Sequence, residues 1–367
     1  MKHLLTSMTT ITTTCPTTYF AGANTSRGFM GAYPALVREG ELDRLYILKG
    51  GSGTGKSTLI RACAEHARQA GAEVTMLLCS SDPTSADGVI LTGKNGRRAA
   101  VVDGTAPHTV DPVLPGAVGE IVPLGECWQT ARLTAARSEI IRHTEEKQVA
   151  YRLAYRYLAA YGEITDAARA LLSECILRDK MTAAVRRLTA GIPKGKGCRE
   201  EIRCTAAVSM RGMYRLSTFG QLARREIAVL DAYGSAAFFW DALREVAAER
   251  RCSVYFAPAP GETETPFEAY LPESGIAFRT VYEKREDGGA TVNMQRFLDR
   301  RALAACRSRL RFADRCRAML MTGALESLQR AREHHFALEE IYKNAMDFTA
   351  VEQIGERITR EIRGLLG

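Results

Sequence analysis

The chain has 367 residues, of which 46% are hydrophobic and 25% are charged. At roughly 150 residues per domain, this length predicts two domains or three, and the composition is typical of a globular protein and excludes collagen or a disordered chain. No window approaches the roughly 18 consecutive apolar residues of a membrane span, so we predict no membrane segment. Lys and Arg outnumber Asp and Glu by 50 to 42, a mild positive charge that is compatible with anionic small molecules, nucleic acid or acidic proteins as partners.

The N-terminal segment and the cysteines indicate where the protein works. Residues 1–18 are rich in threonine and lack the apolar core of a secretory signal, so we expect a disordered or loosely packed lead-in. The ten cysteines include no C-x-x-C pair, and even Cys198 and Cys204 lie six positions apart. Neither a zinc ribbon nor a disulfide framework fits this spacing, which favours free thiols and a cytoplasmic location.

A glycine-rich segment follows a short apolar run in the first part of the chain. The run at 45–48 leads into Gly50-x-x-x-x-Gly55-Lys56-Ser57, the complete sequence pattern of a phosphate-binding loop. Apolar residues at helical spacing continue to residue 67. Strand, loop and helix thus follow in the order that phosphate binding needs, because the loop N–H groups and the helix N-terminus then face the same anion.

Each part of this loop has an expected role in binding ATP and Mg²⁺. Glycines let backbone N–H groups converge on phosphate oxygens without a Cβ in the way. Lys56 is expected to reach the β- and γ-phosphates, and the Ser57 hydroxyl to be a ligand of Mg²⁺. The residues expected to bind the nucleotide are Gly50, Gly51, Ser52, Gly53, Thr54, Gly55, Lys56, Ser57 and Thr58.

An apolar run that ends in aspartate is the expected place for a second Mg²⁺ ligand. Such a run ends in Asp103, and Asn95-Gly96 predicts a hairpin in which residues 89–91 and 98–102 pair antiparallel. We therefore assign Asp103 to Mg²⁺, with an aspartate that merely starts a turn as the alternative. No Glu follows Asp103 directly, so the glutamate base of many ATP-driven motors is missing there.

Three further polar residues are candidates for catalysis beside Lys56 and Asp103. Asp82 and Asp87 lie in the loop after the apolar run 74–78, where either can orient water or a substrate hydroxyl, or simply cap the loop. His108 can sense the γ-phosphate or transfer a proton. Its alternative is a histidine that is hydrogen-bonded within a proline-rich turn.

Several strings resemble a poorly characterised family of bacterial P-loop ATPases. They are YFAGANTSRGF (19–29), LKGGSGTGKST (48–58), CSSDPTSADGV (79–89) and DGTAPHTVDPVLPGAVGEIVPLG (103–125). The resemblance covers most of the chain and is specific within residues 19–127. It implies two tandem P-loop halves, each followed by a helical insertion, and ATP binding by residues 50–58, but it implies no substrate.

Residues 226–283 follow the plan of the first half at an offset near 180 residues. The expected elements are an apolar strand at 227–230, a helix at 241–250, a strand at 254–257 and a hairpin with Pro272 and Gly275 at its tip. Arg211-Gly212 similarly echoes Arg27-Gly28. At the positions of Gly55-Lys56-Ser57 the copy has Ala237, Phe238 and Phe239, or close neighbours, which offer neither cation nor hydroxyl. We predict a degenerate copy that binds no phosphate; the alternative is two α/β units that are alike in architecture alone.

Helical spacing dominates the remaining regions. Residues 128–160 and 165–188 have apolar positions three to four apart on either side of Gly162, which predicts a helical hairpin closed by a linker at 191–197. Residues 297–346 repeat this plan around Thr322-Gly323, and Thr349-x-x-Glu352 predicts a final amphipathic helix. Nucleic acid is only weakly supported as a partner, because few aromatic residues accompany the charges.

The sequence thus predicts an α/β P-loop NTPase fold that is duplicated, with a degenerate second copy and helical hairpin insertions. The expected parts are a P-loop NTPase domain (19–127), a helical hairpin and linker (128–200), a degenerate P-loop-like domain (201–296) and a C-terminal helical region (297–367). The expected function is that of an ATPase, with ATP and Mg²⁺ as cofactors, which couples nucleotide state to the arrangement of domains or of a protein partner. A kinase that uses an unknown small-molecule acceptor near Asp82 or Asp87, and a nucleotide-gated scaffold with negligible turnover, are the alternatives.

Overall fold

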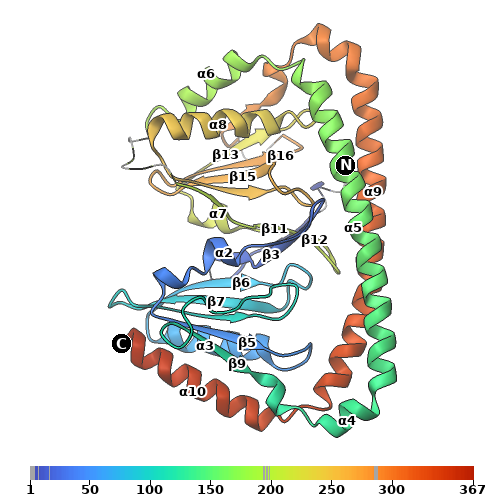
Figure 1. The fold of residues 1–367 in the computed structure, drawn as a ribbon. Coiled ribbons are helices and arrows are strands. Elements are labelled where there is room, and N and C mark those ends of the chain that lie inside the picture. The colour runs from blue at the N-terminus through green and yellow to red at the C-terminus, as the bar shows by residue number, and fades with distance from the viewer. Residues whose placement is uncertain are drawn as a thin grey trace.

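The structure is a computed structural model that describes residues 5–6, 8–15, 17–192, 195, 197, 199–284 and 288–367. Two six-stranded sheets lie one above the other, and a pair of long helices runs along one side of both (Figure 1). Parallel strand pairs occur in each sheet, so the fold belongs to the α/β class. Among the described residues, none of the helices combines the length and apolar character that a membrane span requires.

The first sheet contains the strand that precedes the phosphate-loop sequence. Its order is β2-β6-β7-β8-β5-β9; β7 runs antiparallel to its two neighbours, β6 and β8, and the other neighbouring pairs are parallel. The strands are β2 (Thr18–Phe20), β5 (Arg44–Lys49), β6 (Glu73–Leu78), β7 (Ala86–Thr92), β8 (Arg98–Asp103) and β9 (Gly119–Pro123). The predicted hairpin at Asn95-Gly96 is confirmed, with Ile90 opposite Ala100. β5 is followed by α3 (Lys56–Gln69), which packs its apolar side on the sheet.

The second sheet repeats this arrangement strand for strand. Its order is β10-β14-β15-β16-β13-β17, with the same succession of parallel and antiparallel pairs. The strands are β10 (Glu200–Ile202), β13 (Arg225–Leu230), β14 (Val254–Pro258), β15 (Pro266–Leu271), β16 (Ile276–Val281) and β17 (Thr291–Asn293). The helix after β13 is α8 (Ala236–Arg250), which begins earlier than the predicted residue 241. It does so because Phe239 and Trp240 are fully buried, as part of the helix face that packs into the core of the second half.

Each half extends a hairpin onto the other half. In the first half β3 (Gly22–Thr25) and β4 (Gly28–Gly31) form it, and in the second half β11 (Ala206–Ser209) and β12 (Gly212–Leu216) form it. The backbone N–H of Ser26 donates to the Gly261 carbonyl at 2.8 Å, and that of Met210 donates to the Ser81 carbonyl at 3.0 Å. The tip of each hairpin therefore binds a loop of the opposite half, which is the loop after β14 for Ser26 and the loop after β6 for Met210.

The N-terminal segment takes part in this exchange. Thr9–Ile11 form β1, which pairs in parallel with β12 of the second half. Disorder is therefore wrong for this strand, whereas its exposed and half-buried side chains are compatible with the loose packing that was the other expectation for residues 1–18. Apolar residues of both halves meet between the sheets in one cluster, which includes Phe20, Leu77, Phe219 and Phe267.

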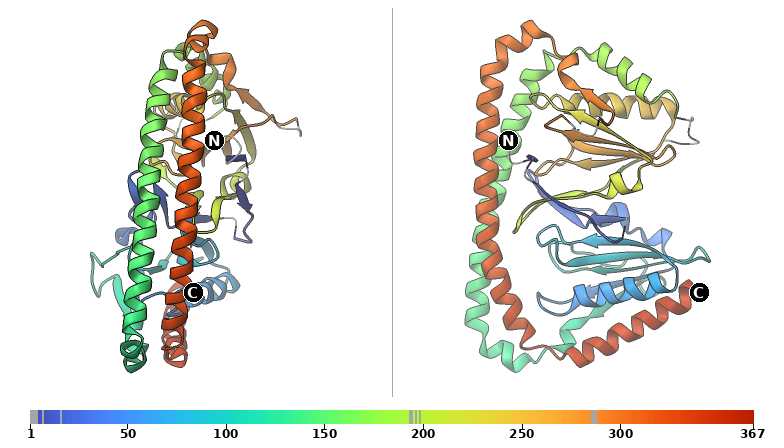
Figure 2. Two further views of the ribbon diagram at one scale, coloured as in Figure 1. Left: turned by 90° about the vertical axis from the view of Figure 1, so that its right-hand side faces the viewer. Right: turned by 180° about the vertical axis from the view of Figure 1, so that it is seen from behind.

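The long helices do not form a separate hairpin in each region. α5 (Arg137–Ser173) continues through Gly162, and α9 (Arg300–Lys343) continues through Thr322-Gly323. The two helices instead pair with each other: His143 lies against His334 and Cys175 against Cys306, so they run antiparallel (Figure 2). The prediction of one helical hairpin in each insertion is wrong, because each region contributes one long helix to a joint pair.

The glycines that suggested helix breaks lie at contacts instead. A Cβ added to Gly162 would lie 2.6 Å from the Ser26 Cβ, and one added to Gly323 would lie 3.1 Å from the Tyr157 ring. Glycine lets the hairpin tip at Ser26 approach α5, and it lets α5 approach α9. Tertiary contact, not helix termination, explains both residues.

The shorter α-helices include α2 (Tyr33–Leu36), α4 (Thr130–Ala135), α6 (Arg178–Leu188), α7 (Thr218–Leu222) and α10 (Phe348–Leu366). Of these, α2 and α7 lie between the two sheets, and α4, α6 and α10 lie toward the ends of the molecule (Figure 1). The final amphipathic helix is confirmed as α10, although its cap is Asp347, whose Oδ1 accepts from Ala350 N at 3.2 Å. Its apolar side packs with α3 in one cluster. Of the predicted linker at 191–197, positions 193, 194 and 196 lie outside the described residues.

We expect Gly162→Ala to destabilise the chain by about 1–3 kcal/mol, because the new methyl group overlaps Ser26 in a packed contact. Gly364→Ala is the matched control: it lies in α10 with no atom within 4 Å of an added Cβ, and should stabilise by about 0.5–1 kcal/mol through helix propensity. Urea unfolding of both variants measures the difference. Equal stabilisation by both would show that the hairpin tip does not pack closely on α5.

Candidate functional site

The loop from Gly50 to Gly55 leaves β5 and turns directly into α3. Gly53 and Gly55 have φ values of 73° and 82°, in the left-handed region that glycine adopts without strain. A Cβ on Gly53 would also lie 2.5 Å from the Glu339 carbonyl oxygen of α9. The loop thus needs glycine both for its backbone path and for its close contact with a long helix.

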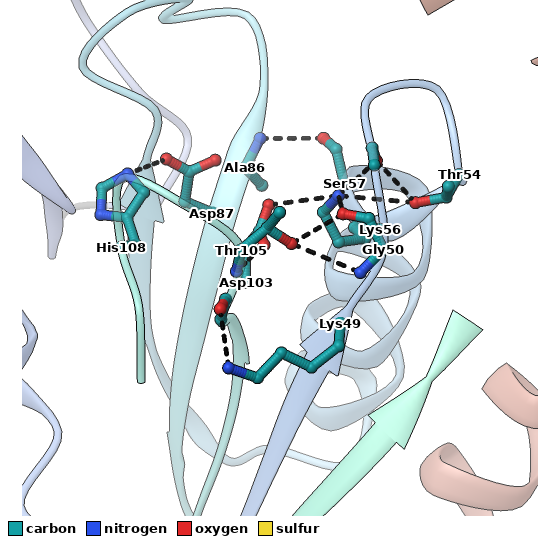
Figure 3. Close-up of polar contacts among 12 residues, drawn as sticks. Lys49, Gly50, Thr54, Lys56, Ser57, Ala86, Asp87, Asp103, Thr105 and His108 are labelled. Atoms are coloured by element: carbon teal, nitrogen blue, oxygen red, sulfur yellow. Dashed lines mark hydrogen bonds and ion pairs between the residues drawn. The ribbon is translucent and has the colours of Figure 1, made fainter. Parts of the chain in front are cut away.

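Lys56, Ser57 and Asp103 lie together at the carboxyl ends of β5 and β8 (Figure 3). The Lys56 Nζ donates to the carbonyl oxygens of Gly50 and Gly51, at 2.8 and 2.6 Å, and lies 3.5 Å from the Asp103 Oδ2. Burial raises the pKa of Asp103, although the Lys56 charge partly offsets this effect. The sequence-predicted lysine, hydroxyl and carboxylate are thus within one site.

Threonine and backbone groups hold these residues in place. Thr105 donates its N–H to the Asp103 Oδ1 at 2.8 Å and its hydroxyl to the Gly50 carbonyl at 2.7 Å, so the end of β8 is tied to the loop. The Ser57 Oγ accepts from Ala86 N at 2.8 Å, which leaves the second lone pair of that oxygen for another ligand. Thr54 is buried and donates to the Gly51 carbonyl.

The residues present fit Mg²⁺ only together with phosphate oxygens. Among the described residues, no group of three or more His, Cys, Asp and Glu side chains is arranged to hold a metal ion. Mg²⁺ is usually held by one or two protein ligands together with substrate phosphates and water. Ser57 and Asp103 meet this requirement when the phosphates of a nucleotide are bound. The two adjacent histidines of α9 do not form a metal site: His334 is paired with His143, and among the described residues His335 has no metal-binding partners.

His108 and Asp87 form a buried pair beside the site. The His108 Nε2 lies 3.0 Å from the Asp87 Oδ2, without the alignment of a hydrogen bond, and the Nδ1 has no partner in the described part of the chain. The imidazole is packed between Phe29 and Tyr33, whose ring centroids are 4.8 and 5.2 Å away. The turn is therefore an aromatic pocket that holds His108 against Asp87, and Tyr33 also donates to the Asp87 carbonyl.

Asp82 is bound by an arginine of the second half, which sequence reasoning did not place in this site. Arg211, at the tip of the β11–β12 hairpin, donates to both carboxylate oxygens at 2.8 and 3.2 Å, and Thr84 donates its N–H and its hydroxyl to one of them. Burial opposes ionisation of Asp82, but these hydrogen bonds outweigh it and lower its pKa. The echo of Arg27-Gly28 by Arg211-Gly212 is the sequence signal that pointed to such a hairpin.

The ends of the long helices surround the phosphate-loop sequence. A Cβ on Gly51 would lie 3.6 Å from the side chains of Trp128 and Tyr342, which stand near the start of α4 and the end of α9. A Cβ on Gly55 would lie 3.4 Å from Val351 and 3.6 Å from Phe348 of α10. These residues are 70 to 300 positions away in the chain, so no local pattern indicated them. A change in the conformation of the loop would act directly on three helices.

The second half fills the corresponding loop with its own carboxylate. Counted from the start of α8, the residues at the positions of Gly55-Lys56-Ser57 are Ser235, Ala236 and Ala237; Phe238 and Phe239 lie further along the helix, which corrects the sequence alignment. The Asp231 carboxylate accepts from the N–H groups of Gly234 and Ala236 at 2.9 and 2.8 Å. The loop N–H groups that bind phosphate in a phosphate loop are thus used within the chain.

A cavity of about 470 Å³ opens beside this second loop, between α5 and α9. Its charged lining includes Asp231 and Glu262 together with Arg169 and Arg317. Burial raises the pKa values of Asp231 and Glu262, and the Arg317 charge partly offsets the effect. Carboxyl and guanidinium groups thus share the lining, which also includes Asp314, Arg311 and Arg315.

Comparisons of the chain with protein-family models, with curated proteins and with solved structures found no match. The resemblance to bacterial P-loop ATPases therefore stays an expectation. The functional assignment depends on the geometry of the site itself.

We predict that the chain binds one nucleotide, in the first half only. Desolvating a triphosphate against Asp231 without free N–H donors or a lysine costs several kcal/mol, which excludes the second loop. Calorimetric titration with a non-hydrolysable ATP analogue measures the ratio. Two equivalents per chain, or tight binding that survives Lys56→Ala, would contradict this prediction.

Proposed function

We propose that the chain is a P-loop NTPase that binds ATP with Mg²⁺ and hydrolyses it to change the arrangement of its long helices. In this proposal the two halves are a duplicated P-loop-like domain, of which the second copy is degenerate. The observation that carries it is the position of Lys56, Ser57 and Asp103 around a glycine loop that is in contact with α9 and α10. We also propose a cytoplasmic location for the protein.

The local chemistry supports the binding of a nucleoside triphosphate. The lysine, the glycine loop and the N-terminus of α3 all present positive charge or N–H donors to one place, which is the requirement for phosphate. Lys56 now donates to two carbonyl oxygens of its own loop and would exchange these for phosphate oxygens. Charge-assisted bonds of this kind are stronger than bonds between neutral groups.

The contacts of the loop support coupling to the helices. Phosphates bound at Gly50–Gly55 would restrain a loop that packs on Glu339 and Tyr342 of α9 and on Phe348 of α10. Because protein interiors are close-packed, the loop cannot change shape without moving these neighbours. ATP binding and product release are therefore proposed to act on the α5–α9 pair.

One alternative is favoured by a specific observation. The residue after Asp103 is Gly104, so the glutamate that often activates water beside this aspartate is missing, and a nucleotide-gated scaffold with slow turnover is our second candidate. No observation favours the kinase, because Asp82 and Asp87, the two expected acceptor-binding carboxylates, lie against Arg211 and His108. Free phosphate without an added acceptor identifies an ATPase, a phosphorylated small molecule identifies a kinase, and neither product identifies the scaffold.

We expect Lys56→Ala to weaken ATP binding by at least about 100-fold, since the ammonium makes charge-assisted bonds to phosphate. The fold should be kept, because within the described part of the chain Lys56 bonds only with its own loop and with Asp103. Calorimetry and thermal unfolding measure the two effects. Lys94→Ala, which removes the same charge from the exposed β7–β8 turn, is the control and should bind ATP as the wild type does. Wild-type affinity in Lys56→Ala would refute the proposed site.

We expect Asp103→Asn to lower Mg²⁺-dependent turnover by at least about 100-fold and to leave metal-free nucleotide binding nearly unchanged. The amide keeps the shape of the carboxylate but loses the charge that faces the metal. Turnover and affinity are measured with and without Mg²⁺. If Asp82→Asn or Asp87→Asn gives this pattern and Asp103→Asn does not, the assignment of the metal ligand is wrong.

A further inference from the structure

Lys147 of α5 is on the side of the helix that contacts α9 and the loop after β6. Lys147 lies one turn after His143 and one turn before Tyr151, so the three side chains share one face of the helix. His143 contacts His334 of α9 at 3.0 Å, and the Tyr151 hydroxyl donates to the Ser81 Oγ at 3.2 Å, next to Asp82. Lys147 is therefore held between α9 and the Asp82 loop.

The ammonium of Lys147 is partly buried and has no hydrogen bond or ion pair within the described ranges of the chain. Loss of hydration alone lowers its pKa, with no charged neighbour to compensate. The nearby His335 supplies no negative charge to Lys147. Burial and the charges of Lys147 and Lys56 lower the pKa of this imidazole to about 4, so it is neutral at pH 7. The phosphate-loop sequence borders the same region: Gly53 packs on Glu339 of α9, and Ala86, which follows the Asp82 loop, donates its N–H to the Ser57 Oγ at 2.8 Å.

The three aspartates around this space already have partners in the chain. Asp82 is held by Arg211, Asp87 lies against His108, and Asp103 lies against Lys56 and bonds with Thr105. An unpaired charge held out of water is unfavourable until an anion reaches it. In a phosphate loop the backbone and the lysine hold the β- and γ-phosphates, and the γ-phosphate is the terminal group of the nucleotide. A bound triphosphate can thus supply the anion that Lys147 lacks.

We infer that Lys147 binds the γ-phosphate of ATP, so that the nucleotide site is shared between the first sheet and the helix α5. This inference rests on the proposed ATP site. It adds a means by which the site discriminates ATP from ADP, because only ATP has a γ-phosphate that reaches α5. The contact forms when ATP binds and is lost when the γ-phosphate leaves. It gives the α5–α9 pair a direct means of responding to hydrolysis.

The test compares the affinities of ATP and ADP for the full chain by calorimetry. Lys147→Ala should weaken ATP binding about 10- to 100-fold, the value of a bond between charged groups, and leave ADP binding unchanged. Lys147→Met keeps the length of the side chain and should have the same effect. Arg152→Ala removes the same charge from an exposed position of α5 and should alter neither affinity.

A second readout separates a ligand contact from a structural role. Removing an unpaired, partly buried charge should maintain or raise the unfolding temperature of the nucleotide-free Lys147→Met chain, while its ATP affinity falls. Equal loss of ATP and ADP affinity, or no loss of either, would overturn the inference for Lys147 while leaving the ATP site intact. Failure of the wild-type chain to bind either nucleotide would instead refute the proposed function.

Discussion

The antiparallel contact between α5 and α9 is the interaction on which the rest of the structure depends. A long helix with an apolar stripe is unstable alone in water and needs a partner for that stripe. Here Leu158 of α5 and Met321 and Leu328 of α9 are buried in one cluster, which also includes Val208 of the second-half hairpin. The helices start in different halves, and each runs alongside both sheets (Figure 2). Neither half has a complete set of neighbours without the helix of the other.

The exchange of hairpins uses the same contact in both halves, with unequal strength. Arg211 binds Asp82 with side chains that are 28% and 11% exposed, whereas Arg27, at the tip of the other hairpin, binds Glu264 and not Glu262, the counterpart of Asp82, with side chains that are 67% and 73% exposed. An exposed ion pair contributes about 0–1 kcal/mol, and removing one partner of a buried pair costs more. The stronger contact is on the loop next to the lysine-bearing phosphate-loop sequence. The two halves are therefore alike in backbone, but the ion pairs that their hairpin tips make with the opposite half differ in burial.

Local sequence patterns predict the elements that form from neighbouring residues. β5, the glycine loop and α3 follow from one contiguous stretch, and the hairpin of β7 and β8 follows from Asn95-Gly96. The pairing of α5 with α9 could not be predicted, because helical periodicity gives the apolar stripe but not its partner. Gly162 suggested a break for the same reason: its contact with Ser26 is more than 130 residues away in the chain. Arg211 and Lys147 enter the site through this long-range packing, so the loop sequence alone could not indicate them.

The N–H groups of the two loops differ in the anion that they bind, and this difference bears on how the proposed function would move the helices. In the second half Asp231 is covalently part of the loop that it fills, so its bonds with Gly234 and Ala236 persist whatever the ligand concentration. In the first half the corresponding charge would come from a nucleotide, which binds and leaves. The first loop packs on Glu339 and Tyr342 of α9, so a change in that loop acts on α9. On the proposed function, hydrolysis in the first half therefore moves α5 and α9 against a second half that serves as a fixed support, which explains why a copy without a lysine is retained.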